Sequence, residues 1–234
     1  LQYLEKDEIQ MVHYPDFFEE GYKHKFDKDI YHYLDNVARN DQYQMDRGFC
    51  HRLLRCSVVI WQFKNIEELK TKYREVIDVL ENSYAGEPNT PDLQQLKGMI
   101  REFEEELVWA YNGVQVNHVH HLHLGFYQDK GITKGVNIER DVMPIVKQFR
   151  EIQPDIISVT LDPEGSGPDT HYKVLQATAA AVAEWSKEKD LSNVRIYGYR
   201  NVWFKFHPVD ANMYVPVSLN ALAVLDKSFA ASYL

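Results

Sequence analysis

"DIISVTLDPEGSGPDTHYKVLQATAAAVAEW" (residues 155–185) decides the fold of this chain of 234 residues. The stretch begins with an apolar run rich in β-branched residues, which predicts a short buried strand. Asp, Pro, Glu, Gly and Ser then form a turn, and an alanine-rich helix follows that ends near Trp185. His171 lies in the first turn of that helix, and Asp169 or Thr170 is its expected cap. A strand that leads through a turn into a helix predicts half of a crossover unit in a parallel sheet.

The segments on either side continue this alternation of strand and helix. Runs of strand or extended character are expected at 116–127, 154–160 and 193–204. Amphipathic helices are expected at 90–113, 139–153 and 218–234. The pattern predicts an α/β fold of the Rossmann-like kind, with a mainly parallel sheet flanked by helices and a helical region at the N-terminus.

The N-terminal region has the apolar spacing of helices. "DIYHYLDNVARN" places four apolar side chains on one helical face, namely Ile30, Tyr33, Leu34 and Val37. Further on, Asn65 is the expected N-cap of a helix, and Glu68 completes a capping box. Residues 83–92 contain a glycine and two prolines and are the best candidate linker. We therefore divide the chain into a helical region or insertion, 1–88, and an α/β domain, 89–234.

Composition excludes several classes of protein. The net charge is −9 and no stripe of Lys and Arg is present, which argues against binding to nucleic acid. No apolar run approaches the roughly 20 residues that a membrane-spanning helix needs, and no signal peptide is visible. The two cysteines, Cys50 and Cys56, are expected to be buried thiols rather than a disulfide. These features predict a cytoplasmic protein without a membrane span.

The loop after 154–160 is the expected position of a functional site. In open α/β sheets, ligands bind in the crevice at the carboxyl ends of the strands, and this loop lies at such an end. An imidazole at His171 could ligate a metal or polarise a carbonyl group there. The alternative is that His171 is a surface residue and that the loop only turns the chain.

Several blocks of the sequence together resemble the PIG-L/LmbE family of zinc-dependent de-N-acetylases. "FREIQPDIISVTLDPEGSGPDTHYKVLQATAAAVAEW" resembles the block in which a metal-binding His opens a helix. "MIREFEEELVWAYNG", "HLGFY", "YGYRNVWFKFHP" and "LDKSFAASYL" are similar to other family blocks in the same order. The resemblance covers roughly residues 93–234. It is nearest to the branch in which this domain follows a glucosamine-6-phosphate deaminase-like domain.

The resemblance implies hydrolysis of the acetamido group of an N-acetylglucosamine-type amino sugar. In the family a zinc ion activates a water molecule, and His171 corresponds to one of its ligands. Asp169 is a candidate catalytic carboxylate, although such loop carboxylates more often cap turns. Candidates for substrate binding are Arg101, His123 and Arg200. The alternatives are an ion pair of Arg101 with a neighbouring glutamate and stacking of Arg200 on Tyr199 or Trp203.

The first family block, His-Pro-Asp-Asp, is absent from this chain. "HYPD" at 13–16 lacks a preceding strand and is interpreted as an accident of a helical region. The position of the family's oxyanion-stabilising His is taken by Pro168. Zn²⁺ is therefore expected only if another segment or subunit completes the site, and such a partner would also complete the sheet. The alternative is a catalytically inactive scaffold or oligomerisation module beside a glucosamine-6-phosphate deaminase-like domain.

Two charged or imidazole-rich stretches have simpler interpretations. Strand alternation in "HVHHLH" would place His118 and His120 on one face and His121 and His123 on the other. Paired ligands are possible there, but ordinary strand histidines are favoured because no acidic residue or cysteine accompanies them. "EFEEE" (102–106) is expected to be a solvated acidic face of a helix.

Overall fold

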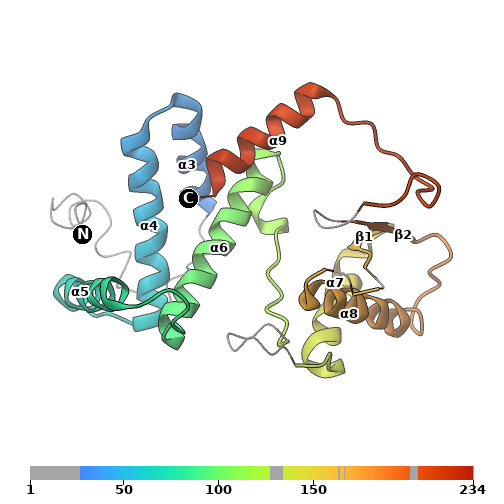
Figure 1. Cartoon of the computed structure of the whole chain (residues 1–234), viewed down its shortest axis with the longest axis horizontal. Helices are drawn as coiled ribbons and strands as arrows, with labels where there is room; N and C mark the ends of the chain where they lie inside the picture. The colour runs from blue at the N-terminus through green and yellow to red at the C-terminus, as the bar shows by residue number, and fades with distance from the viewer. Residues whose placement is uncertain (1–26, 127–133, 163, 166, 201–204, 234) are drawn as a thin grey trace. The chain divides into compact units, whose positions relative to one another are not determined.

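The computed structural model describes residues 27–126, 134–162, 164, 165, 167–200 and 205–233. The chain divides into two compact units (Figure 1). Unit 1 comprises Leu1–His120 and Val217–Leu234, and unit 2 comprises His121–Pro216. The domain boundary predicted from the sequence, at residue 88, stays a prediction.

In its described part, unit 1 is helical. Its elements are α3 (Asp27–Arg39), α4 (Gln42–Trp61), α5 (Ile66–Asn82), α6 (Pro91–Tyr111), a 3₁₀-helix η1 (Val116–His118) and α9 (Leu219–Ser232). α6 packs against α3, α4 and α9, so it joins the C-terminal helix α9 to the core of unit 1 (Figure 1). The predicted N-terminal helices are confirmed for the residues that the structure describes.

The apolar spacing read in α3 produces a real core. Ile30 and Tyr33 are buried against Phe103, Leu107 and Val116. The rings of Tyr33 and Phe103 meet edge to face with centroids 6.0 Å apart, a favoured geometry for aromatic pairs. The Tyr33 hydroxyl donates a hydrogen bond to the Ala231 carbonyl of α9 (3.1 Å), which satisfies the polar end of a buried side chain.

The predicted cap of α5 is confirmed. Oδ1 of Asn65 accepts hydrogen bonds from the backbone N–H groups of Glu67 (3.1 Å) and Glu68 (3.0 Å). The Glu68 carboxylate in return accepts from the Asn65 amide and from the backbone N–H of Lys64. The predicted linker, 83–92, connects α5 to α6 inside unit 1.

The prediction of a solvated acidic face at 102–106 is wrong. Glu104 and Glu106 are buried, with 2% and 1% of their surface exposed. Arg52 of α4 donates a hydrogen bond to Glu106 (2.7 Å), and Arg101 donates one to Glu104 (2.6 Å). Sequence periodicity could not reveal the first of these pairs, because its partners lie 54 positions apart.

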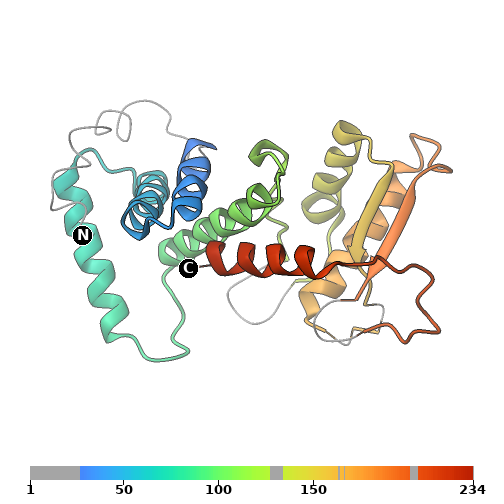
Figure 2. The ribbon, with the colours of Figure 1, turned by 90° about the horizontal axis from the view of Figure 1, so that it is seen from above.

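Unit 2 contains one β-α-β crossover. Its elements are a π-helical turn η2 (Ile138–Val142), α7 (Met143–Ile152), β1 (Ile156–Thr160), α8 (Asp169–Trp185) and β2 (Arg195–Tyr199). β1 and β2 are parallel and pair from Ile156↔Arg195 to Thr160↔Tyr199 (Figure 2). Parallel neighbours need a crossover connection, and α8 supplies it. The strand, turn and helix predicted from 155–185 are therefore confirmed.

The core of unit 2 lies on one face of this small sheet. Ile157 of β1 packs with Ala177 and Ala181 of α8, while Phe149 of α7 meets Trp185 with ring centroids 5.3 Å apart. The two alanines have no exposed surface, since their short side chains let the helix approach the strand closely. The alanine-rich composition of the helix is thus a packing feature.

Other parts of the predicted sheet are not formed by the described residues. The expected extended run at 116–127 contains η1 and no strand up to Phe126, because no partner strand lies beside it. The described chain is mainly helical with a two-stranded parallel sheet. It is α/β in this limited sense, and a Rossmann-like sheet with helices on both faces is not confirmed.

The predicted cap of α8 is also wrong. The N-cap is Pro168, which has no side chain that could accept a hydrogen bond, and Asp169 is the first helical residue. The Asp169 carboxylate instead accepts from Lys173 Nζ one turn further on (2.6 Å). An acidic residue in the first turn still interacts favourably with the helix dipole.

Candidate functional site at the carboxyl end of the sheet

The carboxyl ends of β1 and β2 bring several charged side chains to one edge of the sheet. Asp162 and Glu164 follow β1, and Arg200 follows β2. Arg200 donates hydrogen bonds to Asp162 (3.2 Å) and to Glu164 (2.8 Å). Asp162 is 5% exposed and also accepts from the backbone N–H of Gly167 (2.7 Å). Arg200 therefore fixes the loop after β1 to the end of β2.

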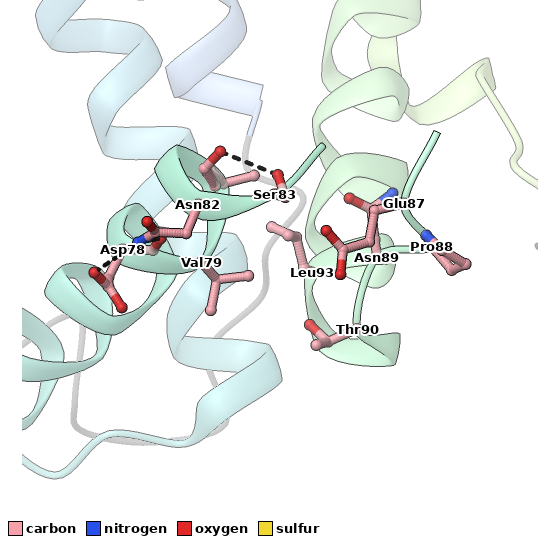
Figure 3. Close-up of a pocket in the computed structure, with 10 residues that line it drawn as sticks. Asp78, Val79, Asn82, Ser83, Glu87, Pro88, Asn89, Thr90 and Leu93 are labelled. Atoms are coloured by element: carbon pink, nitrogen blue, oxygen red, sulfur yellow. Dashed lines mark hydrogen bonds between the residues drawn. The ribbon is translucent and has the colours of Figure 1, made fainter. Parts of the chain in front are cut away.

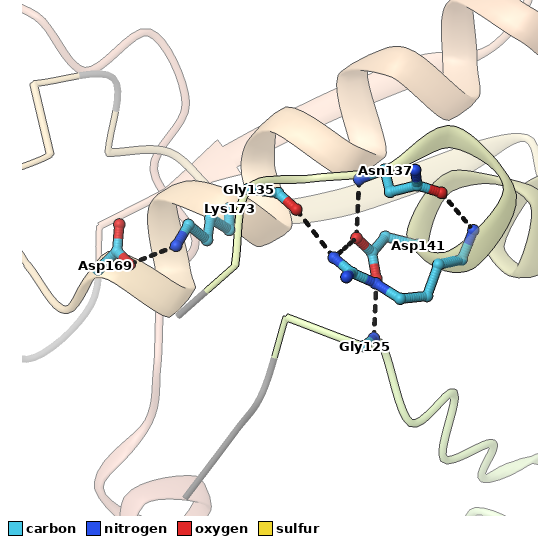
Figure 4. Close-up of polar contacts among 7 residues, drawn as sticks. Gly125, Gly135, Asn137, Asp141, Asp169 and Lys173 are labelled. Carbon is cyan, nitrogen blue, oxygen red and sulfur yellow. Dashed lines mark hydrogen bonds and ion pairs between the residues drawn. The ribbon is translucent and has the colours of Figure 1, made fainter. Parts of the chain in front are cut away.

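The first turn of α8 completes this edge. His171 is half-buried at the third residue of the helix, and its backbone N–H donates to the carbonyl of Pro168 (2.9 Å). Lys173, with 11% of its side chain exposed, is held by Asp169 (Figure 4). Sequence reasoning missed Lys173, although its spacing of four from an acidic residue is a usable signal.

A second carboxylate organises the neighbouring loop. Asp141 has no exposed surface and accepts four hydrogen bonds (Figure 4). The donors are the backbone N–H groups of Gly125 (2.7 Å) and Asn137 (2.8 Å), and Nε (2.9 Å) and Nη2 (2.6 Å) of Arg140. These donors, the Arg140 guanidinium first, hold the pKa of Asp141 below its usual range. Asp141 thus joins residue 125 to residue 137 as a staple.

Gly125 is part of this staple because the Arg140 side chain leaves no room there for a Cβ atom. A Cβ atom added at Gly125 would lie 2.1 Å from Cδ and 2.4 Å from Nε of Arg140. Any larger residue would displace the guanidinium from Asp141. Nothing in the sequence distinguishes this glycine from those in ordinary turns.

The other predicted site residues are distributed as follows. Arg101 belongs to unit 1, is 70% exposed and pairs with Glu104, which is the alternative that the sequence left open. His123 belongs to unit 2, is exposed and has a positive φ of 49°. Arg200 stacks over Phe206, with its guanidinium carbon 5.2 Å from the ring centroid. Trp203, one of the predicted stacking partners, and the "HYPD" of 13–16 lie outside the described residues.

The described residues do not fit a complete metal centre. In the ranges that the structure describes, no group of three or more His, Cys, Asp and Glu side chains could hold a metal ion. The expected alternation of histidines along one strand is also wrong, since His118 ends η1 and residues 119–126 form no strand. A catalytic zinc site needs three protein ligands, so His171 with its described neighbours falls short of one.

A pocket that the sequence did not indicate lies against β2. Its volume is about 650 Å³, and residues of the segment 205–215 line it together with those of β2. Aromatic side chains of Tyr197, Tyr199 and Phe206 line it together with polar groups of Asp210 and Asn212. Segment 205–215 has no helix or strand, so no periodic sequence pattern could predict this pocket.

A smaller pocket in unit 1 has a different character. It measures about 310 Å³ and lies where α5 passes into α6 (Figure 3). Its amides are used internally: Asn82 donates to the Asp78 carbonyl and carboxylate, and Asn89 donates to Gln94. These contacts terminate α5 and order the connection, so we assign this pocket to structure.

Comparison with known proteins gives one informative relative. A glucosamine-6-phosphate deaminase-like protein of Bacteroides thetaiotaomicron is 34% identical over 163 residues. The match covers 67% of this chain and 24% of the relative, so the chain spans about a quarter of the length of the protein it matches. No family model matches the chain. No solved structure matches it significantly.

The helices were also compared with the length and hydropathy that a bilayer requires. In the ranges described here, no helix is both long and apolar enough to cross a membrane.

Proposed function

We propose that this chain forms one wall of a hydrolytic site for N-acetylglucosamine-type amino sugars, in a cytoplasmic protein. The remaining wall would come from another segment or subunit. The similarity to a glucosamine-6-phosphate deaminase-like protein supports a role in amino-sugar chemistry. The resemblance of 155–185 to a de-N-acetylase block supports amide hydrolysis as the reaction.

The observation that carries the proposal is the arrangement at the carboxyl end of β1. His171 stands in the first turn of a crossover helix, and the loop before it is fixed by Arg200 through Asp162. This is the edge of a parallel sheet at which α/β proteins bind ligands. Such a loop can hold an imidazole in a constant position, which general acid–base chemistry requires.

The sheet itself supports the need for a partner. Arg195 N–H donates to the Asp155 carbonyl (2.9 Å) and Leu161 N–H donates to the Tyr199 carbonyl (2.8 Å). The backbone N–H and C=O groups of the odd-numbered residues of β1 therefore point toward β2. Those of the even-numbered residues between 156 and 160 point away from it. In the described part of the chain the sheet has two strands, so this edge of β1 is unpaired there. Protein sheets rarely leave such an edge open, since it pairs readily with another strand.

Zn²⁺ belongs to the proposal only under one condition. The described residues supply too few ligands, so the ligands besides His171 would have to come from outside them. Asp169 is a weak candidate for the catalytic carboxylate, because its side chain already pairs with Lys173.

The unpaired edge also favours a second candidate function. A chain with an open sheet edge could serve as a scaffold or oligomerisation module next to a glucosamine-6-phosphate deaminase-like domain. In that case His171 would have no chemical role, and its substitution would change assembly little.

Acetate release by the full-length polypeptide that contains this chain tests the proposal. With N-acetylglucosamine 6-phosphate as substrate, His171→Ala should reduce the rate by about 100-fold or more, the usual range for an acid–base or ligand residue. His118→Ala, an exposed histidine of unit 1, is the matched control and should leave the rate unchanged. Equal rates for wild type and His171→Ala would remove the catalytic role. A wild-type protein that releases no acetate but assembles through this chain would favour the scaffold.

A further inference from the structure

The pocket against β2 combines aromatic and aliphatic residues with a few polar ones, a composition that suits the ring of a carbohydrate. Tyr197 and Tyr199 are two positions apart on the same strand and therefore project from the same face. Phe206 adds a third aromatic ring from the segment opposite. Aromatic rings offer flat apolar faces of the kind that the C–H groups of a pyranose ring can cover.

The polar groups of this pocket are available to a ligand. In the described part of the chain, the side chains of Asp210, Asn212 and Tyr199 form no hydrogen bond with protein. A carboxylate accepts from hydroxyl groups, and an amide both donates and accepts. This differs from the pocket between α5 and α6, where Asn82 and Asn89 are occupied by protein groups.

The floor and one end of the pocket are held in place. Gly198 of β2 packs so closely that an added Cβ atom would lie 2.6 Å from Cδ2 of Leu161. Arg200, at the end of the strand, is fixed by two carboxylates and by stacking on Phe206. A site whose walls are fixed before the ligand arrives loses less free energy on binding. The volume of about 650 Å³ falls in the range of small-molecule sites.

We infer that this pocket binds the ring of a hydroxyl-rich sugar, with its C–H groups against Tyr197, Tyr199 and Phe206 and its hydroxyls on Asp210 and Asn212. Arg200, which reaches both this pocket and the loop that leads to His171, would couple sugar binding to the hydrolytic edge. The inference rests on the proposed function only for the choice of an amino sugar as ligand.

Photo-crosslinking of the full-length polypeptide tests this inference. The probe is N-acetylglucosamine that carries a diazirine on its acyl group, followed by peptide mapping. Label should appear in peptides from 195–215 and disappear with excess N-acetylglucosamine. Tyr199→Ala should lower that label about tenfold, the effect of a lost aromatic contact. Asn212→Ala should lower it about fivefold, because one hydrogen bond is lost. Both side chains are exposed, so neither change removes a core contact.

Two control variants separate this inference from the proposed hydrolysis. Asn82→Ala, in the pocket of unit 1, should keep full labelling, and so should His171→Ala. Labelling of 195–215 that is equal in wild type, Tyr199→Ala and Asn212→Ala overturns the sugar pocket, even if acetate is released. Labelling that falls in both pocket variants, from a protein that releases no acetate, supports the pocket and contradicts the hydrolysis.

Discussion

Asp29 in unit 1 and Asp141 in unit 2 are both buried, with 6% and 0% of their surface exposed, yet their pKa values move in opposite directions. Asp141 accepts four hydrogen bonds, and its pKa is lowered. Oδ2 of Asp29 lies 2.6 Å from Nε of Arg55 but accepts no hydrogen bond within the described residues. Burial then dominates and raises the pKa of Asp29 to about 7.

The two carboxylates differ in the donors that reach them, and a carboxylate that has lost water is stabilised in its ionised form where such donors replace that water. Asp141 replaces its lost water with backbone N–H groups and a guanidinium, so ionisation costs little. Asp29 stands among Arg52, Arg55 and Glu106, whose charges partly cancel at its position. Asp141 therefore holds residues 125 and 137 together. The ionised carboxylate of Asp29, in contrast, lowers the stability of unit 1 to an extent that depends on pH.

Removal of the Asp141 carboxylate is the strongest way to break this comparison. Asp141→Ala should lower the free energy of unfolding of unit 2 by about 2–3 kcal/mol, because several part-buried donors lose their acceptor. Hydrogen exchange of the backbone amides of α7, read by mass spectrometry, measures the loss. Lys147→Ala on the exposed face of α7 is the control and should change exchange little. Equal protection in the two variants would show that the staple contributes nothing.

The same carboxylate has a defined pH window. Because its folded-state pKa lies below the ordinary value of 3.8, its stabilisation is complete above that pH and is lost as the pH falls below it. Unit 2 of the wild type should therefore lose protection on acidification below about pH 4, whereas Asp141→Ala should lose little more.

These two aspartates also mark the limit of what sequence can predict. The crossover helix and the cap at Asn65 follow from contacts between residues a few positions apart, which periodicity and residue type encode. Asp141 and Glu106 act through partners 16 and 54 positions away, so "EFEEE" was predicted to be a solvated acidic face and Asp141 was not singled out. Burial of a charged side chain depends on what the rest of the fold places opposite it.

The candidate site likewise has one part that local sequence could predict and another that it could not. The position of His171 at the start of a helix after β1 was readable, because strand, turn and helix are local. The role of Arg200 in fixing that loop was not, since its partners Asp162 and Glu164 lie 38 and 36 positions earlier, in the loop after β1. The pocket against β2 depends on an irregular segment, 205–215, for which no repeating sequence pattern exists.

Titration of Asp29 tests the same comparison, with a smaller expected change in the free energy of unfolding. A raised carboxyl pKa means that the folded chain binds a proton more tightly than the unfolded one between about pH 4 and pH 7. The free energy of unfolding of unit 1 should therefore fall as pH rises through this window and level off above it. Asp29→Asn should remove on the order of 2 kcal/mol of that fall.

Denaturant unfolding of wild type and Asp29→Asn at several pH values between 4 and 8, followed through hydrogen exchange of α3, measures the difference in slope. Asp27→Asn, an exposed carboxylate at the start of the same helix, serves as the control. Parallel pH profiles for wild type and Asp29→Asn would mean that Arg55 compensates the buried charge fully.

The cap of α5 provides the smallest effect, at a site where water can replace the lost contact. Asn65→Ala removes the acceptor for the N–H groups of Glu67 and Glu68, which are exposed. The expected loss is about 1 kcal/mol, seen as faster hydrogen exchange in the first turn of α5, and Asn65→Asp should retain most of the protection. The exposed cap of Asn65 is expected to contribute less than the acceptor at Asp141, because water can replace the lost hydrogen bonds only where the donors are exposed. A loss at Asn65 as large as that at Asp141 would contradict this explanation.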